Sequence, residues 1–146
     1  MATIDLPNNI LEALSTVLQQ LQQSLPEVKQ APDFSAIAFK WENGELKAIH
    51  QLKRIELNDL KGIERQKEKV LQNTEQFLNG LPANDVLLTG SRGTGKSSIV
   101  RALLTEYAEQ GLRLIEIERD DLSELPEIQK LIAERPEKFI VYCDDL

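Results

Sequence analysis

The sequence predicts an α/β fold with three layers, in which a parallel sheet lies between helices. Three observations lead to this class. In the second half of the chain, strand-like runs alternate with segments of helical periodicity. The run 139–143 is apolar throughout, as in a strand that is covered on both faces. The glycine-rich segment 90–97 joins a strand-like run directly to a helix-like one.

Composition limits the classes of protein that the chain can belong to. It has 146 residues, 41% of them hydrophobic, and a formal net charge of −7. This is enough for one ordinary core, and the acidic balance disfavours nucleic acid as a partner. One cysteine excludes an internal disulfide, and no run approaches the roughly 20 apolar residues of a membrane span. Because the N-terminus also lacks a secretion signal, we expect a cytoplasmic protein with no membrane contact.

Residues 1–54 are expected to form an N-terminal appendage. Between residues 7 and 25, apolar side chains recur at spacings of three and four, which predicts an amphipathic helix. Its apolar stripe either packs on the same domain or binds a partner. Residues 26–32 read as a linker. The runs 36–41 and 45–49 flank Glu42-Asn43-Gly44, and the Asn-Gly pair predicts a β-hairpin.

Residues 55–146 are expected to form the main domain. A loop over 55–63 precedes a helix over 64–78, which Asn79-Gly80 closes as a C-cap. The run 85–89 predicts a strand and the residues from 98 onward a helix, which Gly111 ends before a strand over 112–117. Pro126 opens a short helix and Pro136 ends it before the strand 139–143.

The segment 90–97 matches the phosphate-binding loop G-x-x-x-x-G-K-[ST], or Walker A motif, at every required position. Its glycines allow successive amides to point at phosphate oxygens, and the following helix adds its positive end. We therefore predict that ATP binds through the loop and the helix start. The residues concerned are Gly90, Ser91, Arg92, Gly93, Thr94, Gly95, Lys96, Ser97 and Ser98. Lys96 is expected to place its charge between the outer phosphates.

Three side chains predict Mg²⁺ and water chemistry at the same site. The Ser97 hydroxyl is expected to ligate an ion that bridges two phosphates. Asp144 and Asp145 directly follow the apolar run 139–143, where ligands gather outside the carboxyl ends of parallel strands, and they form a Walker B pattern. Asp144 is expected to hold Mg²⁺ through a water, and Asp145 to orient or deprotonate the attacking water. A polar turn is the alternative interpretation of this acidic pair.

These motifs resemble those of a family of bacterial stand-alone P-loop ATPases of the AAA+ superfamily, whose function is not assigned. The resemblance also rests on residues 57–63, 66–67, 73–74, 82–84, 111–116 and 143–146, and it covers nearly the whole chain beyond Phe34. It implies an AAA+ type core. It further implies that the segment with Leu60, Gly62 and Ile63 packs against adenine, where the residues alone would indicate only a loop before a helix.

The chain departs from the AAA+ pattern in two ways. Many AAA+ proteins have Glu in place of Asp145, which puts the rate of hydrolysis in question more than binding. The sequence also ends at Leu146, before the sensor residue, arginine finger and lid of such proteins, so we expect an incomplete core, truncated after the Walker B motif. The AAA+ strand that lies between 86–89 and 139–143 has no counterpart, which would leave a gap or force direct pairing. We expect low stability and little hydrolysis from these 146 residues.

The leading hypothesis is an ATP-binding protein that, in complete form, is a Mg-dependent ATPase coupling hydrolysis to conformational change. The expected partners are ATP, an unidentified protein client and, in complete form, further copies of the chain. One alternative is a P-loop phosphotransferase acting on a small acceptor, and another is an interaction module that binds nucleotide without hydrolysis. No Asn-Lys-x-Asp guanine signature is present, which disfavours a GTP switch.

Overall fold

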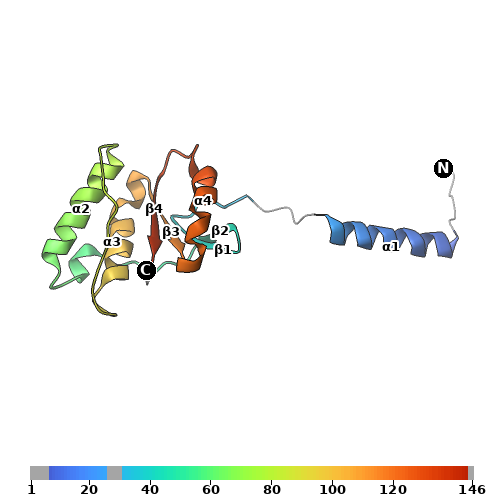
Figure 1. The fold of residues 1–146 in the computed structure, drawn as a ribbon, viewed down its shortest axis with the longest axis horizontal. Helices are drawn as coiled ribbons and strands as arrows, with labels where there is room; N and C mark the ends of the chain where they lie inside the picture. Colours follow the sequence, from blue (N-terminus) through green and yellow to red (C-terminus); the bar gives the residue numbers. More distant parts are fainter. Residues whose placement is uncertain (1–6, 26–30, 145–146) are drawn as a thin grey trace. The chain divides into compact units, whose positions relative to one another are not determined.

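A computed structural model describes residues 7–25 and 31–144 (Figure 1). The chain divides into two compact units, Met1–Ala31 and Pro32–Leu146. Within the described ranges, no helix is long and apolar enough to cross a membrane.

The first unit contains helix α1 (Asn8–Ser24), as the apolar spacing predicted. The helix begins after Pro7, whose carbonyl accepts hydrogen bonds from the amides of Ile10 at 2.9 Å and Leu11 at 3.2 Å. It ends at Leu25, whose backbone is extended. Among the described residues of this unit nothing covers the apolar stripe, and no residue of α1 is buried.

The second unit is built on a four-stranded open sheet in the order β2-β1-β3-β4. Its strands are β1 (Ala38–Glu42), β2 (Glu45–Ile49), β3 (Leu112–Ile117) and β4 (Lys138–Cys143). β1 and β2 form the predicted antiparallel hairpin, and Asn43 (φ 55°) and Gly44 (φ 72°) both adopt the positive φ that its tight turn requires. β3 pairs in parallel with β1 and with β4. The α/β class with a mostly parallel sheet is thus confirmed.

Helices cover both faces of the sheet. They are α2 (Glu64–Leu78), α3 (Lys96–Tyr107) and α4 (Leu125–Ile132), with short 3-10 turns η1 (Leu57–Asp59), η2 (Ala108–Gln110) and η3 (Arg119–Glu124). Figure 1 shows α2 and α3 on one side of the sheet and α4 on the other.

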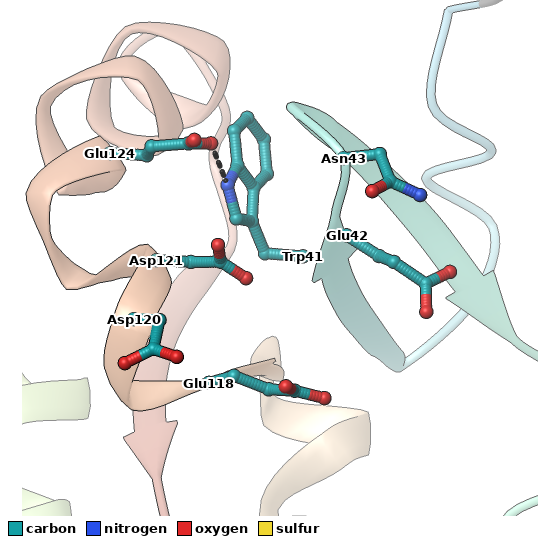
Figure 2. Close-up of a pocket in the computed structure, with 7 residues that line it drawn as sticks. All are labelled: Trp41, Glu42, Asn43, Glu118, Asp120, Asp121 and Glu124. Atoms are coloured by element: carbon teal, nitrogen blue, oxygen red, sulfur yellow. Dashed lines mark hydrogen bonds between the residues drawn. The ribbon is translucent and has the colours of Figure 1, made fainter.

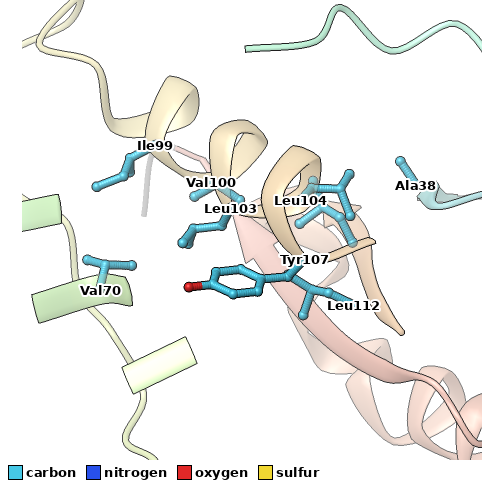
Figure 3. Close-up of a cluster of buried hydrophobic side chains, with 9 residues drawn as sticks. Ala38, Val70, Ile99, Val100, Leu103, Leu104, Tyr107 and Leu112 are labelled. Carbon is cyan, nitrogen blue, oxygen red and sulfur yellow. The ribbon is translucent and has the colours of Figure 1, made fainter. Parts of the chain in front are cut away.

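Each face of the sheet has its own hydrophobic cluster. On the α4 side, Trp41, Ile115 and Ile128 are buried, and the Trp41 indole donates a hydrogen bond to Glu124 Oε2 at 2.6 Å (Figure 2). On the other side, Leu112 and Leu114 of β3 pack with side chains of α2 and α3 (Figure 3). Each such fully buried aliphatic side chain stabilises the fold by about 1.5–3 kcal/mol. The cluster on the α2 and α3 side, which includes Ile99, Leu103 and Leu104 of α3, holds this helix, and with it the glycine-rich loop, against the sheet.

The predicted strand over 85–89 is wrong. Residues 82–91 form no regular secondary structure, and Leu87 is 73% exposed. A strand needs a neighbour to pair with, and the order β2-β1-β3-β4 gives this segment none among the described residues. Instead, the Asn73 side chain holds it, donating to the Asn84 carbonyl at 2.8 Å and accepting from the Asn84 amide at 2.9 Å.

The position of β4 also differs from the prediction. The apolar run 139–143 predicted a central strand buried on both faces, yet β4 is the last strand of the described sheet and Val141 is 38% exposed. Of the two arrangements expected around this strand, direct pairing with 86–89 does not occur in the described part of the chain. An apolar strand is buried only where neighbouring elements cover it, and the sequence of the strand does not show whether such elements are present.

The hairpin belongs to the same sheet as the strands that follow it. β1 pairs with β3 through Ala38–Leu114, Phe39–Ile115 and Lys40–Glu116. All strands described within residues 32–144 therefore belong to one sheet, and β1 and β2 are two of its four strands. The expected division into residues 1–54 and 55–146 stays a prediction.

Candidate nucleotide-binding site

The backbone of the loop 90–97 takes conformations that only glycine adopts readily. Gly90, Gly93 and Gly95 have φ of 151°, 83° and 90°. A Cβ atom on Gly90 would lie 2.8 Å from Thr94 Oγ1, so the loop also needs glycine there for space. The Thr94 hydroxyl and amide both donate to the Ser91 carbonyl, at 2.8 Å and 3.3 Å, and close the loop on itself. The sequence pattern and the loop conformation therefore agree.

Lys96 extends across the loop. Its ammonium group donates to the carbonyl of Gly90 at 2.6 Å and to that of Ser91 at 3.0 Å. An ammonium has three donors, so these two bonds leave one for another acceptor. The charge is thus held over the same backbone that the glycines shape, which is the place where an anion would be bound.

The N-terminus of α3 emerges directly from the loop. Gly95 is its N-cap, in the left-handed region, and no side chain caps it. The Gly95 carbonyl accepts the first helical hydrogen bond from the Ile99 amide at 2.9 Å. The amides of the first turn, including those of Lys96, Ser97 and Ser98, have no partner within the helix and present its positive end. Such an end favours an anion such as phosphate.

The segment for which adenine contact is expected lies beside this loop. Ile63 Cδ1 would be 3.8 Å from a Cβ atom on Gly95, and Leu60 and Ile63 pack on the cluster that includes Ile99 and Val100 of α3. Gly62 has φ 75°, and its amide donates to Glu64 Oε1 at 3.2 Å. Apolar side chains and a turn of backbone therefore lie within reach of the loop, although Ile63 precedes Gly90, the first residue of the motif, by 27 positions.

Two contacts fix this segment and the helices beneath the loop. The Lys67 ammonium donates to the carbonyls of Leu57 and Leu60, at 2.9 Å each. The Tyr107 hydroxyl of α3 donates to Glu75 Oε1 of α2 at 2.8 Å. Burial, followed by the contact with Glu75, raises the pKa of Tyr107 to about 12, so its hydroxyl keeps its proton and the bond at neutral pH.

Ser97 and Asp144, the two expected magnesium ligands, both lie near the hydroxyl of Tyr142 on β4. Burial raises the pKa of Tyr142, Ser97 lowers it and the Asp144 carboxylate raises it further, so both groups act on this hydroxyl. The hydroxyl itself is buried and has no hydrogen-bond partner of good geometry. The structure therefore brings the start of α3 and the end of β4 together. Asp145, the expected catalytic residue, lies outside the described residues.

These groups fit a nucleotide with Mg²⁺. The loop has a cradle that a Cβ atom on Gly90 would fill, and the Tyr142 hydroxyl is a buried polar atom that faces the two expected ligands. Among residues 7–25 and 31–144, no three His, Cys, Asp or Glu side chains gather to hold a metal by themselves. Magnesium seldom needs such a cage, because phosphate oxygens and waters supply most of its ligands.

A second hollow lies away from the loop, between the hairpin and η3 (Figure 2). It measures about 430 Å³ and is lined by Trp41, Glu42, Asn43, Glu118, Asp120, Asp121 and Glu124. Glu118 is paired with Lys40 at 3.0 Å and Glu124 with the Trp41 indole. Trp41 is 2% exposed, so its indole packs in the core and offers no free face on which a ligand could stack. This acidic hollow does not suit a polyphosphate.

Two residues at the candidate site, Tyr142 and Lys67, were not predicted from the sequence. Tyr142 and Asp144 lie two positions apart at the end of β4, so the two-residue period of a strand could have placed both on one face. Lys67 gave no comparable signal, because its carbonyl partners come from an irregular turn.

Comparison with known proteins identifies the family. The model of a family described as "Protein of unknown function (DUF815)" matches residues 34–146. The chain belongs to the DUF815 family. A 52-residue part of this DUF815 chain, 36% of its length, is 36% identical to the replication factor C large subunit of Methanococcus maripaludis strain C7. The match spans only 11% of that relative. No solved structure matches.

Proposed function

We propose that this DUF815 chain binds Mg-ATP at the loop 90–97 and forms part of an AAA+ type ATPase. The observation that supports this most strongly is the closed glycine loop at the uncapped N-terminus of α3, with the Lys96 ammonium held across it. The partial similarity to a replication factor C subunit is consistent with a nucleotide-binding relative.

Each group has a defined task in this proposal. The amides of Ser91–Ser97 and the start of α3 bind the phosphate oxygens, and Lys96 balances the charge of the outer phosphates. Leu60 and Ile63 cover the adenine ring, and the backbone at Gly62 contacts its edge. Ser97 and Asp144 hold Mg²⁺, which neutralises charge on the phosphates when bound. Asp145 orients or deprotonates the attacking water.

We expect ATP hydrolysis to drive a conformational change in the protein. Ile63, the N-cap of α2, lies beside Gly95 of the loop, and the Tyr107 hydroxyl of α3 donates to Glu75 of α2, so a change at the phosphates would reach α2. We further propose a cytoplasmic location. The proposed client is an unidentified protein rather than nucleic acid, because the net charge of −7 disfavours binding to a phosphate backbone. A phosphotransferase and a module that binds ATP without hydrolysis are the alternatives.

Calorimetric titration of the chain with Mg-ATP tests the proposal. Lys96→Ala should weaken binding at least tenfold, because it removes a charge-assisted contact to phosphate. Lys130→Ala is the matched control, since Lys130 is exposed on α4, away from the loop, and its ammonium pairs with Glu127 at 2.9 Å. Equal affinity of the two variants would refute the assignment of the loop.

Phosphate release then separates the enzyme classes. Release from ATP without an added acceptor supports an ATPase, and release or transfer only with an acceptor supports a phosphotransferase. Binding without either reaction supports an interaction module. The measurement applies to the chain with any residues that follow it in its natural protein, together with Asp145→Asn as the variant that tests the base.

A further inference from the structure

Five leucines of the first unit follow the alternating spacing of a coiled-coil seam. Leu11, Leu14, Leu18, Leu21 and Leu25 are separated by three, four, three and four residues. A repeat of 3.5 residues keeps such side chains along one line of a helix, which is the pattern by which helices supercoil around each other. All but Leu25 lie within α1, and Leu25 is its C-cap.

The seam is open to solvent in this unit. The exposed fractions of the five leucines are 49%, 49%, 59%, 52% and 65% in chain order, and Ile10 and Val17 beside them are 43% and 50% exposed. A helix of 17 residues is marginal alone in water, since helices this short owe most of their stability to packing of an apolar face. A partner that covers the seam would therefore stabilise α1 as well as bind it.

We propose that α1 packs against α1 of a second copy of this chain through the seam Leu11–Leu14–Leu18–Leu21–Leu25. The residues that flank the seam are uncharged: Ile10, Ser15, Val17, Gln22 and Ser24. In a coiled coil, charges at these flanking positions select the partner, and like charges repel identical helices. Two copies of this helix meet without such repulsion.

Charge also argues against other occupants. Glu12 is the only charged residue of α1, so the helix offers no complement to a strongly charged partner helix. A lipid surface would require Lys or Arg on the polar face, and α1 has neither. Two hollows of the second unit are lined mainly by charged side chains, the acidic one at Trp41 and one along α2 with Glu64, Lys67, Glu68 and Glu75. Neither matches a row of leucines.

The proposal is independent of nucleotide binding, and sedimentation equilibrium of the whole chain tests it. The wild-type chain should show a mass that rises with concentration to at least twice that of one chain. The double variant Leu14→Glu, Leu21→Glu should raise the dissociation constant at least a hundredfold, because it puts two carboxylates per copy into the seam.

A control with the same charge and spacing isolates the seam. Thr16→Glu with Gln23→Glu also adds two carboxylates seven residues apart, but on the opposite side of α1. This variant should associate as the wild type does. The circular dichroism of both variants should show loss of helix only where association is lost.

Three results would overturn the proposal. A wild-type chain that stays monomeric throughout the micromolar range and up to about 1 mM would do so, and so would association that the seam variant leaves unchanged. Equal loss of association in both double variants would also contradict it, since added charge rather than the seam would then be responsible. In the first of these cases, newly exposed surface on the second unit in the seam variant, but not in the control variant, would indicate that the seam packs within one chain.

Discussion

The substitution of Gly95 by Ala tests the loop conformation on which the nucleotide site depends. Gly95 has φ 90° and ψ 10°, and Gly111 at the end of η2 has nearly the same backbone, φ 94° and ψ 10°. A Cβ atom in this left-handed region costs about 1–2 kcal/mol. Space adds little at either position: Ile63 Cδ1 would lie 3.8 Å from the new Cβ at Gly95, an ordinary contact, and nothing lies within 4 Å at Gly111.

Gly95→Ala and Gly111→Ala should therefore destabilise the chain to a similar extent. With a urea m-value of about 2 kcal/mol/M, a loss of 1–2 kcal/mol shifts the midpoint down by about 0.5–1 M. Trp41 is the only tryptophan of the chain and is 2% exposed, so its fluorescence reports unfolding of the sheet. Only Gly95→Ala should also weaken Mg-ATP binding, because Gly111 lies at the opposite end of α3 and η2.

The substitution of Gly95 by Asn sharpens this test. Asn tolerates the left-handed region better than Ala, so Gly95→Asn should recover part of the lost stability. The reasoning fails if Gly95→Ala is neutral while Gly111→Ala is costly, because Gly95 would then not be held at positive φ. It also fails if Asn is as destabilising as Ala, since the cost would then not arise from the backbone.

Three further predictions follow from single contacts. Tyr142→Phe should weaken binding of Mg-ATP about threefold to tenfold and leave binding of ATP in EDTA unchanged, because the lost hydroxyl faces Ser97 and Asp144. Equal loss of affinity in the titrations with and without Mg²⁺ would contradict this. The same variant leaves Tyr107 as the one remaining tyrosine, and its ultraviolet titration should give a pKa of about 12. The pKa of Tyr107 in the folded chain lies above the ordinary value of 10.0, so the stability that its protonated hydroxyl contributes is full below pH 10 and is lost as pH rises toward 12. Glu75→Gln should lower the pKa of Tyr107, because it removes the carboxylate that accepts the hydrogen bond. An unchanged pKa in this variant would exclude the contact. Asn73→Ala should lower the free energy of unfolding by about 1 kcal/mol in urea, through loss of two exposed bonds to Asn84, whereas an unchanged midpoint would show that they do not hold the segment.

Local patterns predicted those elements whose cause is local. The Asn43-Gly44 turn requires positive φ at both positions, and the hairpin follows from that requirement alone. The glycine spacing of the loop likewise reflects backbone geometry, and the structure reproduces it at Gly90, Gly93 and Gly95. The helix over 64–78 matches α2 in both bounds because its C-cap residues Asn79 and Gly80 are encoded next to it.

Sheet order was not predictable in the same way. The segment 85–89 has a strand-like composition, yet a strand exists only where a second strand supplies hydrogen bonds. The pairing of β1 with β3 joins residues more than 70 positions apart, and nothing in either run specifies it. The roles of Asp144 and Asp145 depend on the end of β4, and the structure reaches only Asp144.

The position of Lys96 affects how any variant at this residue is interpreted. Its ammonium bonds to the Gly90 and Ser91 carbonyls, so Lys96→Ala removes both a phosphate ligand and two contacts within the loop. A loss of ATP affinity in that variant therefore combines weaker contact with a less ordered loop. Lys96→Arg retains the charge but not the compact ammonium, because the planar guanidinium spreads its donors over a larger fork. If order of the loop dominates, Arg and Ala should impair binding alike; if charge dominates, Arg should retain most of it.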